Sequence, residues 1–102
     1  MDMATLDAAR RDAFKDYVNS AIHGVFRILQ ENNNAWCDFD YFLIRWVERH
    51  GTYLNAHALG VNHPIDFMLR LQERGLVTVR ISEYNKFHIR MTPLAAAMAG
   101  GP

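Results

Sequence analysis

The side chains with the clearest chemical capacity lie between positions 62 and 74, and they are hydrogen-bond donors and cations. Asn62 and Arg70 are of the types that form paired hydrogen bonds with the edges of adenine and guanine. His63 can donate to a phosphate, and Arg74 is long enough to reach a nucleic-acid backbone. This set indicates nucleic-acid recognition, and the simpler interpretation is an ordinary solvated helix surface.

A second polar set follows at positions 80 to 90. Arg80, Lys86, His88 and Arg90 fall on one side of two alternating segments, with Tyr84 between the segments. Cations in this arrangement can follow the phosphates of a duplex. The alternative is the exposed polar face of a small sheet.

Catalysis and metal binding have little support elsewhere in the sequence. The single cysteine, Cys37, has no second thiol, and its neighbours Trp36 and Phe39 favour a buried apolar role. No two of the five histidines have the i, i+4 spacing of a helical zinc site. Asp38 and Asp40 are close together, but Asp38 is better explained as a helix cap. We therefore expect no enzymatic activity, no metal and no cofactor.

Charge is distributed unevenly, although the chain as a whole is neutral. Residues 1–61 contain six Lys or Arg and eight Asp or Glu, whereas residues 62–102 contain five and three, so the net charges are −2 and +2. Lys and Arg supply most of the nonspecific affinity for DNA. Overall neutrality therefore weakens a nucleic-acid interpretation, and the positive C-terminal part supports it.

Length and composition predict one folded domain over residues 1–102. Half of the 102 residues are apolar, which suffices for one core and not for two. One cysteine is typical of a reducing compartment. Charged residues interrupt every apolar run well below the roughly 18 residues of a membrane span. We expect a cytoplasmic protein without a membrane segment.

Apolar spacing predicts a long N-terminal helix over residues 5–31. Its apolar positions recur at intervals of three and four, namely Leu6, Phe14, Tyr17, Val18, Ala21, Ile22, Val25, Phe26 and Leu29. Gly24 predicts a close helix contact or a bend, and the triplet 32–34 of asparagines predicts the helix end. A domain this small cannot easily cover so many apolar side chains, so we expect part of this helix to pair with a second copy. The alternative is that it only closes the core of the monomer.

Two more helices are predicted before position 60. Residues 39–50 form an amphipathic helix with Asp38 as its N-cap. Residues 52–59 form a short helix that Thr52 or Asn55 caps, with its apolar side chains turned inward.

The C-terminal part predicts a helix, a hairpin and a last short helix. The first of these begins at Pro64, which suits a first helical turn, and ends near Arg74. Apolar and polar residues then alternate over two strands, 77–82 and 86–91, which a tight turn joins. A short helix over 94–99 follows.

Three short phrases join the predicted elements of residues 38–99. Leu59-Gly60-Val61 closes one helix, Gln72-Glu73-Arg74-Gly75-Leu76-Val77 ends the next, and Met91-Thr92-Pro93-Leu94 follows the hairpin. Together they resemble the winged helix-turn-helix family, including bacterial regulators of the multiple antibiotic resistance type. The resemblance implies a mainly α fold with a small β-hairpin, to which the long N-terminal helix is added. It also implies that helix 63–74 enters a DNA groove while the hairpin flanks it.

The helix over 63–74 has two predicted faces. The face expected to turn inward consists of Ile65, Met68, Leu69 and Leu71. The outward set is Asn62, His63, Asp66, Phe67, Arg70 and Arg74. An outward Asp66 repels phosphate, and an outward Phe67 is a better anchor for a protein partner than for a groove. If Phe67 faces inward, this objection to DNA binding weakens.

These observations support two hypotheses of different classes. The first is a small homodimeric transcriptional regulator of prokaryotic or phage type that binds duplex DNA through Asn62, His63, Arg70, Arg74, Arg80, Lys86 and Arg90. The second is a winged-helix module, for example one encoded by a phage, that inhibits or scaffolds a host protein complex. Its partner-binding residues are Asp66, Phe67 and Tyr84. The positive hairpin favours the first hypothesis, and zero net charge favours the second.

Overall fold

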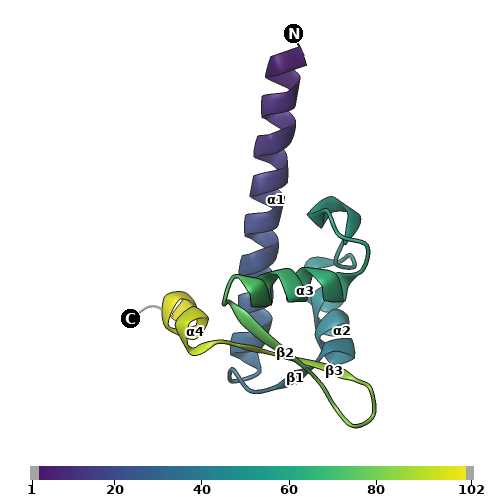
Figure 1. Ribbon diagram of the computed structural model, residues 1–102, viewed down its shortest axis with the longest axis vertical. Helices are drawn as coiled ribbons and strands as arrows, with labels where there is room; N and C mark the ends of the chain where they lie inside the picture. The colour runs from purple at the N-terminus through teal and green to yellow at the C-terminus, as the bar shows by residue number, and fades with distance from the viewer. Residues whose placement is uncertain (1–2, 101–102) are drawn as a thin grey trace.

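The computed structural model describes residues 3–100 and is mainly helical, with a small three-stranded antiparallel sheet (Figure 1). In chain order the elements are α1 (Met3–Glu31), β1 (Cys37–Asp38), α2 (Phe39–His50), the 3-10 helix η1 (His57–Leu59), α3 (Pro64–Glu73), β2 (Val77–Ile81), β3 (Phe87–Met91) and α4 (Pro93–Gly100). Among these described residues, no helix is both long and apolar enough to cross a membrane.

Helix α1 contacts the rest of the chain mainly through its C-terminal half. Ala21, Val25 and Leu29 recur every four residues and are buried, whereas residues 3–16 are all exposed. Figure 1 shows the N-terminal half projecting away from the other elements, and the longest dimension of the molecule is 52 Å. The helix ends in the asparagine triplet, as predicted, with two of its residues at left-handed φ angles of 59° and 56°.

Helices α1 and α2 meet closely at Gly24. A Cβ at this position would lie 2.7 Å from Cζ3 of Trp46 and 3.1 Å from Nε2 of His50. The rings of Trp46 and His50 stack with their centroids 3.9 Å apart, and His50 Nδ1 donates to the Trp46 carbonyl at 3.1 Å. The predicted close helix contact at Gly24 is therefore confirmed.

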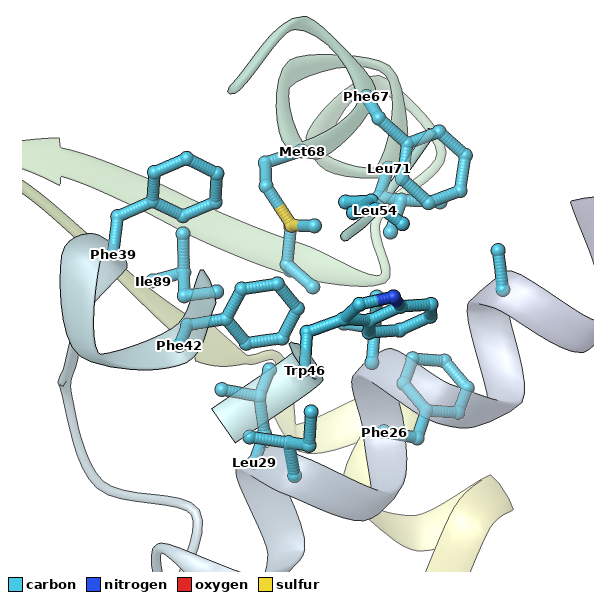
Figure 2. Close-up of a cluster of buried hydrophobic side chains, with 14 of the residues drawn as sticks. Phe26, Leu29, Phe39, Phe42, Trp46, Leu54, Phe67, Met68, Leu71 and Ile89 are labelled. Carbon is cyan, nitrogen blue, oxygen red and sulfur yellow. The ribbon is translucent and has the colours of Figure 1, made fainter. Parts of the chain in front are cut away.

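One buried cluster contains side chains of α1, α2, α3 and β3. Figure 2 shows Phe42 and Trp46 of α2 lying between Leu29 of α1 and Met68 of α3. Ile89 of β3 belongs to the same buried cluster. Burial of aromatic and branched side chains in one cluster is the main favourable contribution to folding. The bounds of α2 agree with the sequence prediction, because the Asp38 side chain caps its first turn at 2.9 Å and 3.2 Å.

The sheet includes a strand that the sequence pattern did not predict. Strands β2 and β3 form the expected hairpin, with Val79 opposite Ile89, and turn through Asn85 at a φ of 58°. Strand β1 pairs with the other side of β3, with Cys37 opposite Ile89, so the strand order is β1-β3-β2. A strand of two residues has no alternation to detect, and only its partner strand defines it.

The predicted helix over residues 52–59 is wrong in its extent. Only His57–Leu59 are helical, as a single 3-10 turn. The side-chain oxygen of Asn55, not Thr52, accepts from the N–H of Ala58 at 3.2 Å. Left-handed glycines at Gly51 and Gly60 bound this segment.

Helix α3 turns a different face to the core from the one predicted. Its buried side chains are Phe67, Met68 and Leu71. Phe67 is 3% exposed and Leu69 is 38% exposed, so the expectation that Phe67 lies outward and Leu69 inward is wrong. The reason is tertiary. Val18 and Ile22 of α1, together with Leu59 of η1, line the flank toward which Phe67 projects, and they cover it there.

Replacing Gly24 with Ala should destabilise the fold. In an open helix this change gains about 1 kcal/mol. Here the new methyl group overlaps Trp46 and His50, and overpacking of this kind costs about 1–3 kcal/mol. We expect a net loss of about 1 kcal/mol in the free energy of unfolding, measured by urea denaturation. Asn19→Ala, exposed in the same helix, is the control and should not destabilise. A Gly24→Ala variant more stable than the parent chain would contradict the close contact.

Candidate nucleic-acid interface

The candidate interface is the outer face of the sheet. Val77 and Ile89 point into the core, so the residues that alternate with them point to the opposite side. In the register of the hairpin, Arg80 lies opposite His88, and Thr78 lies opposite Arg90. Strand alternation therefore places the predicted polar set of the hairpin on one surface.

Two arginines of this surface lie over one indole ring. The guanidinium carbon of Arg80 is 4.1 Å from the ring centroid of Trp36, and that of Arg90 is 5.3 Å from it. Such cation–π contacts contribute about 0.5–1 kcal/mol each at exposed sites. Trp36 is held by β1, which begins at the next residue, and by Asn32, whose side-chain amide donates to the Trp36 carbonyl at 3.4 Å. The ring thus holds two like charges side by side.

We call the surface formed by Trp36, Arg80, Lys86 and Arg90 the Trp36 face. Lys86 alternates with the core-facing residues on the same side as Arg90 and is exposed. None of the three cations of the Trp36 face forms an ion pair with any residue from 3 to 100. The Oδ2 atom of Asp38 lies 3.9 Å from Nε2 of His88, and the Oδ1 atom of Asp38 caps α2. The Trp36 face therefore has a net positive charge.

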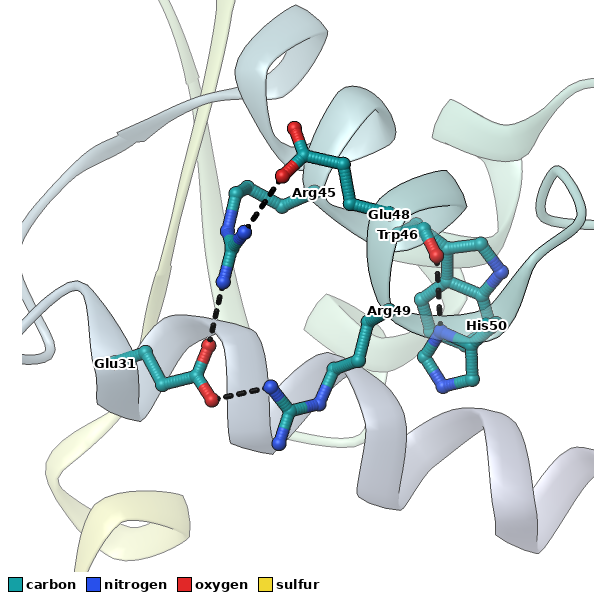
Figure 3. A network of polar contacts seen from close by, with 6 residues as sticks. All are labelled: Glu31, Arg45, Trp46, Glu48, Arg49 and His50. Atoms are coloured by element: carbon teal, nitrogen blue, oxygen red, sulfur yellow. Dashed lines mark hydrogen bonds and ion pairs between the residues drawn. The ribbon is translucent and has the colours of Figure 1, made fainter.

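Arginines on α2 are neutralised by contrast. Figure 3 shows Arg45 donating to Glu48 at 2.8 Å and to Glu31 at 3.2 Å, while Arg49 pairs with the other oxygen of Glu31. The hydrogen bonds to Glu48 and then Glu31 raise the pKa of Arg45 above its ordinary value. Because each charge in this network has an opposite neighbour, the network adds little to the positive potential of the molecule.

Helix α3 presents a mixed face to solvent. Asp66, Leu69 and Glu73 follow one another at spacings of three and four, on the side of the helix opposite to Leu71. Arg70 lies at the flank of this face, with Nη2 3.4 Å from the Gly60 carbonyl. The carboxylates of Asp66 and Glu73 thus lie on the surface that would face the phosphates if α3 entered a DNA groove.

The predicted DNA-binding residues fall into two groups. Asn62, His63, Arg70 and Arg74 are exposed around α3, whereas Arg80, Lys86 and Arg90 belong to the Trp36 face. Helix α3 packs on the core side of the sheet, because Met68 and Leu71 share one buried cluster with Ile89, and Gln72 Oε1 accepts from the N–H of Val79 at the edge of β2 at 2.7 Å. Arg70 and Arg90 therefore lie on different sides of the sheet.

The hairpin turn and the beginning of α3 lie on the same side of the view in Figure 1, with the hairpin turn below α3. After Gly75, at a φ of +75°, strand β2 runs back alongside α3 (Figure 1). Tyr84 at the tip is 78% exposed, and Asn62 and His63 are exposed just before α3. Side chains from both segments can therefore reach one partner.

Trp36 is the site residue that sequence reasoning missed. The available signal was an aromatic residue directly before Cys37, which we interpreted only as part of an apolar environment. Its proximity to Arg80 and Arg90 depends on the pairing of β1 with β3, which no local pattern indicated. The predicted partner-binding role of Phe67 also fails, because a buried ring cannot contact a partner.

Cys37 is buried and lies in the core. Burial, and next the negative charge of Asp38, raise the pKa of its thiol to about 11. At neutral pH the group is a protonated thiol and a poor nucleophile. Within residues 3–100, no three His, Cys, Asp or Glu side chains cluster in a way that could hold a metal ion.

Comparisons with known proteins returned no match. No protein-family model, no curated protein and no solved structure is similar to this chain at the level required.

The raised pKa predicts that Cys37 resists thiol reagents. We expect the native protein to react with a chromogenic disulfide at pH 8 far more slowly than the urea-unfolded chain, whose thiol is exposed and has an ordinary pKa. The absorbance of the released thiolate measures both rates. Equal rates in the two states would contradict the burial of this side chain.

Proposed function

We propose that this chain is a duplex-DNA-binding protein of the winged helix-turn-helix class, in which the Trp36 face contacts the phosphate backbone. The observation that carries the proposal is the pairing of Arg80 and Arg90 over Trp36, with Lys86 on the same side. Cations without an internal partner can neutralise phosphates, and this neutralisation supplies much of the affinity for DNA. Transcription regulation is the role that we propose for such binding.

Support for the class comes from the order and pairing of the elements. Helices α2, η1 and α3 follow one another as the helices of a helix-turn-helix do, and β2 and β3 form a hairpin after them. The strand order β1-β3-β2 attaches this hairpin to the segment that precedes α2. These features agree with the resemblance that the sequence phrases suggested, in which α1 is an additional element.

The proposed mode of binding uses the beginning of α3 rather than its outward face. Asp66 and Glu73 on that face repel phosphate, which disfavours deep insertion of α3 into a groove. Asn62 and His63 directly precede α3 and are exposed. We assign them the base-edge and phosphate contacts of α3, and we assign the remaining phosphate contacts to the Trp36 face.

Binding of a protein is the second candidate function, and the exposed face of α3 favours it. Leu69 is 38% exposed between Asp66 and Glu73, an arrangement that suits a basic surface with an apolar pocket. Tyr84 at the hairpin tip offers an aromatic anchor. In this alternative the chain inhibits or scaffolds another protein.

A salt titration of duplex binding tests the first proposal. Three phosphate contacts predict a slope of about −3 in a plot of log K against log salt between about 50 and 200 mM. Arg80→Ser or Arg90→Ser should weaken binding and reduce the magnitude of this slope by about 1. Fluorescence anisotropy of a labelled duplex gives the affinities. Arg27→Ser removes the same charge from an exposed position of α1 and should leave the slope unchanged.

Two results would count against this assignment. An equal loss of affinity in Arg27→Ser would show that total charge matters and not the Trp36 face. Absence of any binding by the parent chain at about 50 mM salt would exclude duplex DNA as the partner and would favour the protein-binding alternative.

We also propose that the protein is a homodimer that pairs through residues 3–16 of α1. Every residue of this segment, about 21 Å long, is exposed in the monomer, although Phe14 lies beside Gly60. Leu6 and Phe14, 37% and 45% exposed, offer apolar area to a packed neighbour. The segment contains three acidic and three basic residues, Asp7, Asp12, Asp16, Arg10, Arg11 and Lys15. Two copies therefore meet without net repulsion.

A charge on the apolar side of this segment should separate the dimer. Leu6→Glu places a carboxylate beside the exposed Phe14 side of α1, and we expect sedimentation velocity to report a monomer. Ala8→Glu lies two residues along, about 200° around the helix, and should leave the dimer intact. A parent chain that sediments as a monomer at high concentration would contradict the proposal.

A further inference from the structure

A cavity of about 620 Å³ lies between α1, the C-terminal end of α2 and α4. It shares no residue with the Trp36 face. Its polar lining includes His23, Arg27, Arg49 and His50, and its apolar lining includes Phe26 and Met98. The volume falls within the range of pockets that bind small organic molecules.

The charged lining of this cavity has one sign. Arg27 and Arg49 line it, and no Asp or Glu does. Arg49 pairs with Glu31 through one of its nitrogens, so its other N–H groups remain as donors (Figure 3). Arg27 is exposed and forms no ion pair with any residue in the described part of the chain. Glu31 neutralises Arg49, so the uncompensated charge of the lining is that of Arg27, and it favours an anion over a cation.

His50 is oriented so that its second nitrogen faces the cavity wall. Its Nδ1 donates to the Trp46 carbonyl at 3.1 Å, so Nε2 is the ring nitrogen that takes no part in this hydrogen bond. Nε2 lies 3.1 Å from the point that a Cβ on Gly24 would occupy, beside α1. The stacked Trp46 ring fixes this orientation.

We propose that this cavity binds a small organic anion with a carboxylate head and an apolar chain. The carboxylate accepts hydrogen bonds from Arg27 and Arg49, and charge-assisted hydrogen bonds of this kind are among the stronger ones in proteins. The apolar chain packs on Phe26 and Met98 of the same cavity lining. This site does not rest on DNA binding or on dimer formation.

Three small probes separate the two halves of the proposed site. Hexanoate has both a carboxylate and an apolar chain, acetate has only the carboxylate, and 1-hexanol has only the chain. We expect hexanoate to bind about tenfold or more tightly than either of the others, because each lacks one set of contacts. NMR titration of the full chain measures each affinity, and the shifted amides should lie near His23, Arg27 and Ala99.

A pair of matched variants tests the role of charge. Arg27→Gln should weaken hexanoate about tenfold, whereas Arg11→Gln, about 24 Å away along the same helix, should not change it. Both residues are exposed, and an unchanged thermal unfolding midpoint verifies that each variant is folded. Equal binding of hexanoate and 1-hexanol, shifts that map to another surface, or unchanged affinity in Arg27→Gln would each overturn the proposal.

Discussion

The contact between Gly24 and Trp46 determines how the long first helix joins the rest of the chain. Only a residue without a side chain lets the indole approach the backbone of α1, since a Cβ would lie 2.7 Å from the ring. Trp46 in turn lies 6.1 Å from Phe42 between ring centroids, and Phe42 is completely buried. The same approach places His50 at the cavity wall and directs the N-terminal half of α1 away from the core. The core, the cavity and the projecting half of α1 thus all depend on the contact between Gly24 and Trp46.

Those parts of the fold with a local signal were predictable from the sequence. Helix α2 agrees at both ends because Asp38 caps its start and Gly51 accepts the left-handed φ that ends it. The two hairpin strands agree closely because alternation is a property of each strand by itself. The phase of α3 was not predictable, because Phe67 and Leu69 are both apolar. The positions of α1 and η1 decide which of them is covered, and the helix alone contains no such information.

The candidate site was predictable in composition and not in arrangement. Alternation assigned Arg80, Lys86 and Arg90 to one side of the hairpin, and the register agrees with that assignment for Arg80 and Arg90. Trp36 joins them only because a strand of two residues pairs with β3, a contact between segments about fifty residues apart in the sequence. Likewise, the separation of Arg70 from Arg90 follows from which side of the sheet α3 covers, and net charge alone cannot indicate it.

The distribution of charge constrains how this neutral chain can meet a polyanion. Long-range attraction requires net charge, so a chain with none depends on cations that are already close together at contact. The indole of Trp36 holds Arg80 and Arg90 close together before any partner binds, and this reduces the side-chain entropy lost on binding. On the opposite side of the sheet, Asp66 and Glu73 disfavour a phosphate backbone. A duplex on the Trp36 face that also contacts Asn62 and His63 reaches the first turn of α3, where Asp66 Oδ2 accepts from the His63 N–H at 3.1 Å, so the two candidate partners would compete for this part of the helix.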